Sequence, residues 1–393
     1  MKLFWLKLQR EFLRVLNIWT NKEKAGKRMK SLQDGIARVQ ARNTLEQDIP
    51  SLFAAPANTP KPRPIDILIP VYNGFEFLNP CLESIFRNTD LPFHLYLADD
   101  ASPDEKVLPL LQKWAAKKAG QITLLQNGHN GGFAKTVNKL IQASAHDFAL
   151  LNTDTEVPPG WASRLFYPIF TNENIASSGP WSNAGGAYQS LFFDNEETAL
   201  QLPLEETDDL LRIFSPESYV LLPNLMGFCM AVSRTAVKQG GLFDEAYGRG
   251  YFEETDWCFR LNRLGKKHAL VSNLFVYHKG FSSFGNTARY ELLHQNRTLF
   301  KKRYPGALAA MRRARFTPKL QLIHFILLAR YLRTQYNGFS SENAESTAPA
   351  LCTQQKGEIF YYELRLGEKR QYACSRTDLR PYICMPQSFT RPV

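Results

Sequence analysis

Short apolar runs alternate with longer amphipathic segments along the first half of the chain, beginning at Ile65. A run of about four to eight apolar residues has the length of a buried strand, and the longer segments repeat apolar positions at helical spacing. The pattern predicts strands near residues 65–71, 93–100, 122–127 and 148–154, and helices near 75–86, 105–118 and 133–144. We therefore expect an α/β fold of βαβ units, in which helices cover both faces of a mostly parallel sheet.

Polar-rich segments follow each of these predicted strands. They occupy residues 71–73, 99–100, 127–130 and 152–156. Ligands bind beyond the carboxyl ends of the strands in an open α/β sheet, so we expect these segments to converge on one crevice. No GxGxxG motif follows the first strand, which argues against a dinucleotide-binding site there.

The second half of the chain is less regular. A polar loop region extends from residue 180 to residue 220, and residues 226–237 have the pattern of a buried strand that enters a helix. A helix is expected over 254–265, where Gly265 ends it, and a strand over 268–278. Residues 286–335 have a basic, helical pattern, and the alternating run at 358–366 favours a hairpin strand.

The N-terminal flank has an amphipathic pattern. A helix over residues 1–19 would separate its charged side chains from its large apolar ones. The charged face holds Lys7, Arg10, Glu11 and Arg14, and the apolar face holds Phe4, Leu8, Phe12, Val15 and Trp19. Such a helix either lies in a membrane interface or packs on a neighbouring domain or partner.

The proline-rich stretch at 54–64 has the composition of a stiff linker and indicates a domain boundary. We expect four segments along the chain. Residues 1–63 contain the basic helix and linker, 64–285 the α/β domain, 286–335 a basic helical segment, and 336–393 a tail to which we assign no role.

Charge is distributed unevenly along the 393 residues, whose formal net charge is +11. Residues 1–48 carry +6 and residues 301–333 carry +9 without any acidic residue, so the rest of the chain carries −4. A nucleic-acid-binding protein is expected to carry its basic surface on its main folded domain, so this distribution argues against nucleic acid as a partner. The basic flanks instead suit peripheral contact with a membrane surface.

Composition places the chain among globular proteins, since 44% of its residues are hydrophobic and 22% are charged. The apolar run at 322–329 is interrupted by His324 and is shorter than the roughly 18 residues of a membrane span. The six cysteines form no CxxC pair and no secretory signal pattern is present, which favours a reducing, cytoplasmic setting. A disulfide among Cys352, Cys374 and Cys384 is the alternative.

Asp99 and Asp100 end the second predicted strand. A carboxylate at this place can accept the N3–H of a uracil or thymine ring. The same pair, together with Ser102 and Asp104, can also cap the following helix. Both interpretations are compatible with the residues alone.

Asn152, Asp154 and Glu156 occupy alternate positions after the fourth strand, before a Pro-Pro-Gly turn. Alternate oxygen side chains suit a hard divalent cation that also binds phosphate oxygens, although the same residues occur in plain turns. His278, at the end of a later strand, could complete a metal site with Asp154 or be an ordinary polar residue.

Glu253, Glu254 and Asp256 cluster at the start of the predicted helix 254–265. The helix dipole favours acidic residues at a helix N-terminus, which is one explanation. The other is catalysis, because mutual repulsion and partial burial raise a carboxyl pKa toward the range in which a general base works. In that case Lys135 or Lys279 could stabilise a departing diphosphate.

These motifs together resemble the inverting glycosyltransferases of family 2, which have the GT-A fold. The residues that carry the resemblance are PVYN (70–73), LADDAS (97–102), NGGFAKTVN (130–138), LNTDTEVPPGW (151–161), EETDWCFRL (253–261) and the strand-end His278. The resemblance covers residues 65–285. It implies a Rossmann-like, mostly parallel sheet and a divalent cation, Mn²⁺ or Mg²⁺, as cofactor.

The resemblance also implies roles for the residues at matching positions. Asp100 is similar to the pyrimidine-binding acid, Asp154 to the last acid of the DxD metal motif, Glu254 to the catalytic base and His278 to the second metal ligand. Asp256 joins the catalytic group and Glu156 the metal group. The donor-binding group comprises Pro70, Tyr72, Asp99, Asp100, Asn130, Gly132, Lys135, Asn152 and Thr153. The sequence departs from the family pattern at Asn152, which replaces the first DxD acid, and at Glu254, where Asp is common.

The implied reaction is a direct displacement at the anomeric carbon of a nucleotide-activated sugar, with inversion of configuration. The motifs at 130–138 and 151–161 resemble most the branch of rhamnosyl- and galactofuranosyltransferases. The expected donor is a dTDP- or UDP-sugar, and the expected acceptor is a glycan or lipid-linked hydroxyl in cell-surface polysaccharide synthesis. We expect the enzyme in the cytoplasm, peripheral on the cytoplasmic face of the membrane.

Two other functions are weighed against this one. A sugar nucleotidyltransferase shares the sheet but needs a Gly-rich phosphate loop with a basic residue after the first strand, which PVYNGFEF lacks. An inactive membrane-associated scaffold would be expected to have lost the acids of the crevice, which this chain retains.

Overall fold

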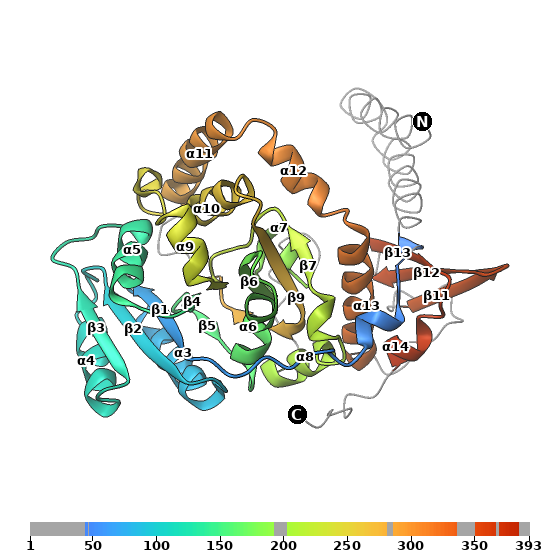
Figure 1. Cartoon of the computed structure of the whole chain (residues 1–393), viewed down its shortest axis with the longest axis horizontal. Helices are drawn as coiled ribbons and strands as arrows, with labels where there is room; N and C mark the ends of the chain where they lie inside the picture. The colour runs from blue at the N-terminus through green and yellow to red at the C-terminus, as the bar shows by residue number, and fades with distance from the viewer. Residues whose placement is uncertain are drawn as a thin grey trace. The chain divides into compact units, whose positions relative to one another are not determined.

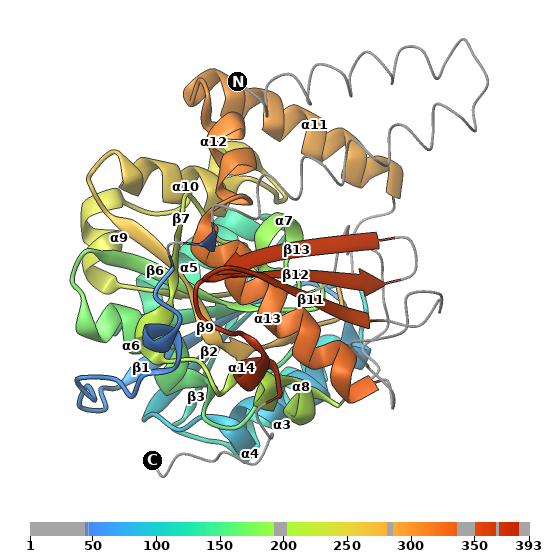
Figure 2. The same ribbon diagram turned by 90° about the vertical axis from the view of Figure 1, so that its right-hand side faces the viewer.

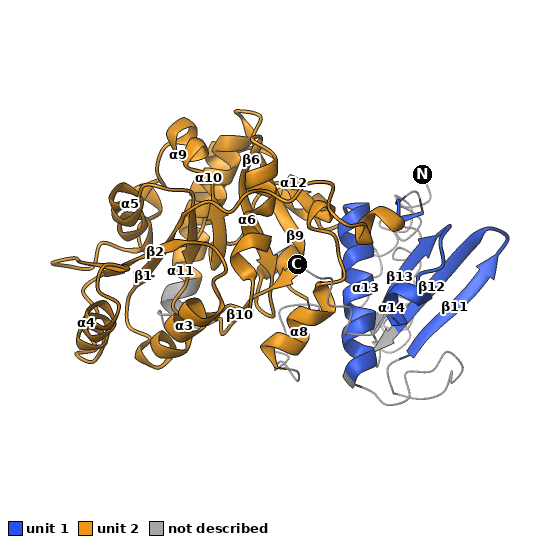
Figure 3. Ribbon diagram, turned by 60° about the horizontal axis from the view of Figure 1, so that its bottom comes forward, with its two compact units in different colours: residues 1–49, 316–393 blue, residues 50–315 orange. Residues whose placement is uncertain are grey.

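The computed structural model describes residues 44–45, 47–191, 203–280, 286–335, 350–366 and 369–384. The chain divides into two compact units, one formed by Pro50–Arg315 and the other by Met1–Ile49 with Phe316–Val393 (Figure 3). The amphipathic pattern expected over 1–19 lies outside the described residues. The division into four segments at residues 63, 285 and 335 stays a prediction.

The larger unit is built on an eight-stranded sheet with the strand order β3-β2-β1-β4-β8-β6-β9-β7 (Figure 1). Adjacent strands pair in parallel, with two exceptions. Strand β8 pairs antiparallel with β4 and β6, and β7 pairs antiparallel with β9. The strands are β1 (Ile65–Val71), β2 (Phe93–Asp99), β3 (Ile122–Gln126), β4 (Phe148–Leu151), β6 (Ile175–Trp181), β7 (Val220–Leu222), β8 (Cys229–Val232) and β9 (Lys267–Phe275). The mostly parallel sheet expected from the alternating pattern is confirmed.

Helices connect these strands, as the periodicity predicted for 75–86, 105–118 and 133–144. The helices are α3 (Phe75–Asn88), α4 (Val107–Lys117), α5 (Phe133–Ala143), α6 (Trp161–Thr171), α7 (Gly186–Gln189), α8 (Leu204–Leu211), α9 (Arg234–Gly240), α10 (Glu253–Asn262), α11 (Asn286–Arg303) and α12 (Ala307–Ala314). Short 3-10 helices lie at Pro50–Phe53, Pro216–Ser218 and Glu245–Tyr247. The region expected to be a polar loop from 180 to 220 thus contains α7 and α8.

The first strand shows why both faces of the sheet are covered. Ile65, Ile67 and Ile69 belong to one apolar cluster with side chains of α3, α4 and α6. Leu68 points to the opposite face, because side chains alternate along a strand, and it is buried as well. Helix α5 packs on β1 and β2. A strand that is apolar on both faces is typical of a parallel sheet between helices.

A second, two-stranded sheet adjoins the end of β4. Its strands, β5 (Thr155–Glu156) and β10 (Tyr277–His278), pair antiparallel. The strand expected over 268–278 is therefore divided into β9 and β10. As a result His278 leaves the main sheet and lies opposite Thr155.

The smaller unit contains α13 (Pro318–Gln335), α14 (Arg380–Cys384) and an antiparallel sheet of β11 (Ala350–Lys356), β12 (Ile359–Leu366) and β13 (Lys369–Ser375) (Figure 2). The hairpin strand expected at 358–366 is confirmed as β12. Leu322, Ile323 and Phe325 of α13 are fully buried, so the apolar side chains of this helix form part of a core. None of the helices in the described part is long and apolar enough to cross a membrane.

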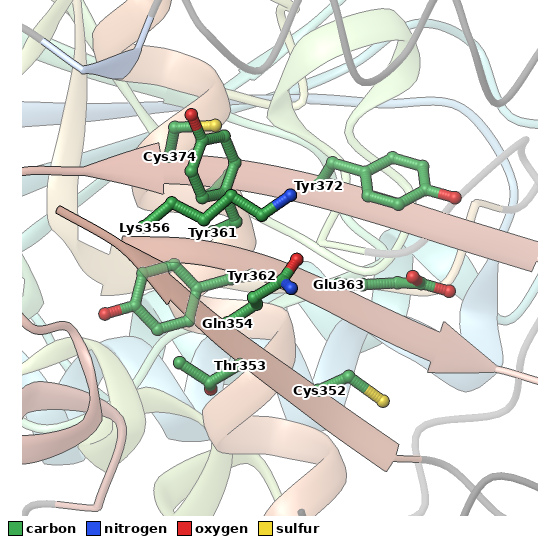
Figure 4. Close-up of a pocket in the computed structure, with 10 residues that line it drawn as sticks. Cys352, Thr353, Gln354, Lys356, Tyr361, Tyr362, Glu363, Tyr372 and Cys374 are labelled. Atoms are coloured by element: carbon green, nitrogen blue, oxygen red, sulfur yellow. The ribbon is translucent and has the colours of Figure 1, made fainter. Parts of the chain in front are cut away.

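A cavity of about 440 Å³ lies on the three-stranded sheet (Figure 4). Tyr361, Tyr372 and Glu363 are among its lining residues, and none of the residues predicted for the donor, metal or catalytic groups is. The cavity is therefore separate from the predicted site. None of the six cysteines, all of which lie in the described part of the chain, forms a disulfide, so the alternative of a disulfide among the last three is not found.

Candidate active site

The strand ends that were expected to converge lie next to one another. The N–H of Asp100 donates to the last carbonyl of β1 at 2.8 Å, and the N–H of Asn127 donates to the carbonyl of Asp99 at 2.8 Å. The end of β4 approaches the end of β1. An added Cβ on Gly74, which follows β1, would lie 3.6 Å from the hydroxyl of Thr153, which follows β4. The ends of β1, β2, β3 and β4 thus meet at one edge of the sheet.

Asp99 and Asp100 have different partners. An Asp99 carboxylate oxygen accepts a backbone N–H three residues further along the chain at 3.1 Å, which is a local cap. Asp100 instead reaches the loop after β3, where it accepts the N–H groups of Gly131 and Gly132 at 2.8 and 2.9 Å. The side-chain amide of Asn127 donates to the same carboxylate at 2.7 Å. Asp100 therefore fixes the NGG segment, residues 130–132, against the end of β2.

Other members of the predicted donor-binding group surround this carboxylate. Asn130 Oδ1 accepts the N–H of Gly132 at 3.0 Å, which closes the turn of the NGG segment. An added Cβ on Gly131 would lie 3.0 Å from Lys135 Cδ and 3.6 Å from Asp100 Oδ1, so both side chains flank this glycine. Positions 70 and 72, which hold proline and tyrosine, are half-buried at the end of β1.

At Gly132 the NGG segment contacts the segment that precedes α10. Its φ is +83°, and an added Cβ would lie 2.8 Å from the Gly248 carbonyl oxygen and 3.0 Å from Arg249 Cα. Only glycine satisfies both conditions without a shift of the backbone. The chain that leads into α10 therefore packs directly on the NGG segment.

Asp154 and His278 form a close pair. Asp154 Oδ1 lies 3.4 Å from His278 Nε2. His278 Nδ1 lies 3.1 Å from the Ala184 carbonyl oxygen, which can only accept, so Nδ1 donates and the Nε2 edge faces Asp154. The imidazole is also stacked on Phe228, with ring centroids 4.8 Å apart. The orientation of the ring is therefore set from two sides.

The chemistry of this pair fits a divalent cation. A carboxylate oxygen and an imidazole nitrogen that lie 3.4 Å apart can both coordinate one metal ion. An imidazole whose Nδ1 donates to a carbonyl is a common ligand arrangement, and Mn²⁺ accepts both oxygen and imidazole donors. No group of three or more His, Cys, Asp or Glu side chains in the described part of the chain could hold a metal alone.

Glu156 is placed away from this pair, although the sequence grouped it with the metal ligands. In the β5/β10 pairing His278 lies opposite Thr155, and Tyr277 lies opposite Glu156. Residues directly opposite each other share a face, so Glu156 and His278 project to different faces. Burial, and then the charge of Glu205, raises the pKa of Glu156.

Helix α10 begins with two buried carboxyl groups. Glu253 and Glu254 are 4% and 7% exposed. Burial raises the pKa of Glu254 to about 7, although hydrogen bonds from the backbone and hydroxyl of Thr255 oppose the rise. Burial and the charge of Glu254 raise the pKa of Glu253 well above its ordinary value, and Glu253 Oε2 has no hydrogen-bond partner within the described residues. The raised pKa of Glu254 therefore lies near neutral pH, where a general base works.

Gly227 and Phe228 connect Glu254 to the candidate metal pair. An added Cβ on Gly227 would lie 3.5 Å from Glu254 Cγ, so the missing side chain leaves room for the glutamate. The next residue, Phe228, stacks on His278, and its carbonyl accepts the N–H of Asn152 at 2.8 Å. One dipeptide thus contacts the candidate base, a candidate metal ligand and the end of β4.

Asp256 is separated from Glu254, although the sequence grouped both as catalytic. Residues two positions apart on an α-helix project roughly 200° from each other. The Asp256 carboxylate accepts hydrogen bonds from the Tyr247 hydroxyl at 2.9 Å, from Arg303 at 3.2 Å and from Arg260 at 3.3 Å. These partners neutralise the carboxylate and make it part of the packing around α10.

Several residues of the site lie outside the sequence motifs. Asn183 exchanges two hydrogen bonds with the backbone of His278, at 2.8 and 2.9 Å, and Ala184 fixes the His278 ring through a carbonyl. Gly227 has no side chain, and this leaves room for Glu254. These contributions come from backbone groups and empty space, which leave no pattern of residue types along the chain.

Residues 66–241 match the model of the family described as Glycosyl transferase family 2. These residues, a little under half of the chain, are therefore similar to a family 2 glycosyltransferase domain. The matched residues include Asp100 and Asp154 and end before Glu254 and His278. No curated protein matches the chain.

Solved glycosyltransferase structures resemble this domain. The mannosyltransferase PcManGT from Pyrobaculum calidifontis, solved with GDP-Man and Mn²⁺, is 15% identical with a TM-score of 0.50, over 86% of this chain and 87% of that chain. GalNAc-T7, solved with UDP, GalNAc and Mn²⁺, is 14% identical with a TM-score of 0.45, over 81% and 73%. At such identities the likeness to PcManGT concerns the fold alone. The larger unit has the GT-A fold, which confirms the expectation from sequence.

Proposed function

We propose that the protein is an inverting glycosyltransferase that moves a sugar from a nucleoside-diphosphate donor to an acceptor hydroxyl. The observation that carries the proposal is the position of Glu254, a buried carboxyl group with a pKa of about 7 that meets the Asp154–His278 pair through the Gly227–Phe228 dipeptide. A base beside a cation-binding pair suits a reaction in which a hydroxyl loses a proton as a diphosphate departs. The family 2 domain supports the same reaction.

The donor nucleotide would bind along the strand ends. Asp100 is held by three N–H donors and keeps lone pairs that can accept the N3–H of uracil or thymine. Lys135 flanks the same glycine, where its ammonium group suits the donor diphosphate. The presence of GDP-Man in the PcManGT structure supports a nucleotide-sugar donor. The remaining donor-binding residues that we propose are Pro70, Tyr72, Asp99, Asn130, Gly132, Asn152 and Thr153.

Asp154 Oδ1 and His278 Nε2 would hold Mn²⁺ or Mg²⁺. When bound, the cation supplies positive charge that stabilises the leaving nucleoside diphosphate. The Mn²⁺ in the PcManGT structure supports this assignment. The Ala184 carbonyl keeps His278 in the tautomer that turns Nε2 toward Asp154, and Lys135 adds a second positive charge on the donor side.

The transfer would proceed as a single displacement. The acceptor oxygen forms a bond to the anomeric carbon on the face opposite the diphosphate, and the bond from that carbon to the diphosphate oxygen breaks. Glu254 takes the proton of the acceptor hydroxyl, and the nucleoside diphosphate leaves with the bonding electrons. Attack from the opposite face inverts the configuration of the sugar.

We further propose a dTDP- or UDP-sugar of the kind used by rhamnosyl- and galactofuranosyltransferases as the donor. The motifs at 130–138 and 151–161 support this choice. A glycan or lipid-linked hydroxyl in cell-surface polysaccharide synthesis is the proposed acceptor. The basic residues at 301–333 support a peripheral position on the cytoplasmic face of a membrane, where such an acceptor is built.

A donor screen tests the proposed function. The purified chain, with Mn²⁺ and a lipid-linked glycan extract, receives UDP-, dTDP- and GDP-sugars one at a time, and released nucleoside diphosphate is measured. We expect release from a UDP- or dTDP-sugar that the Glu254→Gln variant does not support. Release of pyrophosphate from a nucleoside triphosphate and a sugar phosphate would instead indicate a sugar nucleotidyltransferase. Failure to bind any nucleotide would indicate an inactive scaffold.

A further inference from the structure

The turn that leads into α10 has an unusual backbone. Gly248, Gly250, Tyr251 and Phe252 have φ values of 66°, 143°, 70° and 76°. Positive φ is disfavoured for Tyr251 and Phe252, because the side-chain Cβ crowds a carbonyl oxygen. Such a conformation persists only where its surroundings hold it. Since Glu254 follows two residues later, the turn at 247–252 determines where the proposed base lies.

Asn296 on α11 holds this turn. Its side-chain nitrogen lies 2.8 Å from the carbonyl oxygens of Tyr247 and Gly250 and 3.0 Å from that of Tyr251. An amide nitrogen carries two hydrogens, so they are shared among three acceptors. Asn296 is only 6% exposed, so water has little access to replace these bonds. The Asn296 side chain therefore binds three carbonyl groups of the turn.

The same face of α11 shares an apolar cluster with α10, and the two helices are neighbours in Figure 1. The ring of Phe300 lies 5.2 Å, centroid to centroid, from those of Phe252 and Phe259. Arg303 donates to Asp244 at 2.6 Å and to Asp256 at 3.2 Å. Positions 296, 300 and 303 share one helix face. Helix α11 thus supports both the turn and the helix that carries the proposed base.

The opposite side of the turn packs on the NGG segment and on Phe133. The Gly248 carbonyl closes on Gly132, and an added Cβ on Gly250 would lie 3.8 Å from Phe133 Cβ. The turn is therefore enclosed between Asn296 and the NGG segment. If Asn296 released the turn, Glu254 would move relative to the donor side, whose own hydrogen bonds to Asp100 would remain.

We propose that Asn296 is a positioning residue for glycosyl transfer, which holds the turn at 247–252 and thereby fixes Glu254 in the site. The proposal rests on the proposed function, in which Glu254 removes the acceptor proton. Helix α11 lies outside the residues that match the family 2 model, and its sequence indicated only a basic helical segment.

Two variants and a matched control test this role. Asn296→Ala removes the amide, and Asn296→Asp keeps its shape but replaces the donors by an acceptor. Gln295→Ala removes an exposed amide from the adjacent position of α11. The number of UDP-binding sites, measured in the presence of Mn²⁺, gives the amount of folded protein in each preparation. Turnover is then measured with the most active of UDP-glucose, UDP-galactofuranose, dTDP-rhamnose and GDP-mannose, and hydrogen exchange is followed in residues 247–254.

The Asn296 variants should bind UDP within about threefold of the parent affinity, because the donors to Asp100 belong to other segments. Their kcat per UDP-binding site should fall roughly 10- to 100-fold, since a displaced base is poorly aligned for proton transfer. Amide exchange in the turn should accelerate about tenfold or more. The Gln295→Ala variant should match the parent chain in all of these measurements.

An unchanged kcat per site, or unchanged exchange in the turn, would overturn the proposal. A loss of activity that the number of UDP-binding sites fully explains would also overturn it, because Asn296 would then act on folding alone. If neither the parent chain nor Gln295→Ala releases nucleoside diphosphate from any donor, the proposed function fails instead. The exchange comparison then still decides whether Asn296 holds the turn.

Discussion

Two adjacent glutamates at the start of α10 both have raised pKa values. Burial, and then the charge of Glu254, raise the pKa of Glu253 well above its ordinary value, which favours the neutral form that glutamine imitates, whereas burial raises the pKa of Glu254 to about 7. Glu254→Gln should therefore lower kcat by about two to four orders of magnitude with donor binding nearly intact. Glu253→Gln should keep kcat within about threefold. Steady-state kinetics on the matched pair measures the difference.

The pH dependence of the parent chain provides a control for this assignment. A general base acts when deprotonated, so kcat should rise with pH through about 7 and level off above it. Asp256→Asn should mainly lower the melting temperature, because the Arg260 and Arg303 pairs are lost. If Asp256→Asn abolishes turnover of folded protein and Glu254→Gln remains active, the base is misassigned.

The Asp154–His278 pair predicts dependence on a divalent cation. Chelation should abolish transfer, and Asp154→Ala or His278→Ala should weaken Mn²⁺-supported UDP binding by about 10- to 100-fold. Glu156→Gln is the matched control, because Glu156 faces away from His278, and it should leave Mn²⁺ affinity nearly unchanged. Calorimetric titration of UDP with and without Mn²⁺ measures these affinities. Full transfer activity in excess EDTA would contradict the prediction.

At the scale of elements, the NGG segment links β3 and α5 to the turn before α10. Gly132→Ala places a Cβ 2.8 Å from the Gly248 carbonyl at a φ of +83°, so we expect a loss of about 1–3 kcal/mol in unfolding free energy. The kcat should fall at least about tenfold, because the turn that sets Glu254 must shift. Thermal unfolding and kinetics measure both effects.

Gly128 provides the control for this prediction. It precedes the same segment, its φ is not positive, and an added Cβ would have no neighbour within 4 Å. Gly128→Ala should therefore leave stability and turnover close to those of the parent chain. Equal effects of the two substitutions would show that close packing against Gly248 is unimportant.

At the scale of the whole molecule, basic side chains are exposed on two consecutive helices. They are Lys301 and Lys302 in α11, Arg312 and Arg313 in α12, and Arg315 directly after α12. The apolar side chains of α13 are buried and thus do not add an apolar anchor. An electrostatic attachment to anionic lipid should therefore be salt-sensitive.

Co-sedimentation with liposomes tests the membrane contact. The chain should pellet with anionic vesicles at low salt and remain in solution with neutral vesicles or at high salt. Replacing Arg312, Arg313 and Arg315 by glutamine should weaken binding roughly a hundredfold, from about 1 kcal/mol per charge. A chain without residues 1–19 tests the contribution of the amphipathic pattern. A parent chain that stays in the supernatant with anionic vesicles at low salt would contradict the membrane assignment.

The positions of the main strands and helices followed from local periodicity. Ile65, Ile67 and Leu68 already mark β1 as a strand buried on both faces, because the exclusion of solvent selects apolar residues at most positions of such a strand. The convergence of strand ends and the candidate acids followed from the same pattern. The division of 268–278 at Val276 did not, because the pairing of β10 with β5 depends on a segment more than a hundred residues earlier.

The chemical state of the site was decided by tertiary structure. The sequence places Glu253, Glu254 and Asp256 together, but the salt bridge of Asp256 to Arg303 and the burial of Glu254 depend on which distant side chains reach α10. The same holds for Asn296, an ordinary polar residue in a basic helix until it meets the carbonyls of the turn. Residue types and their spacing determine local elements and the available chemistry. Distances between segments far apart in the chain determine which groups are charged, which are paired and which can react.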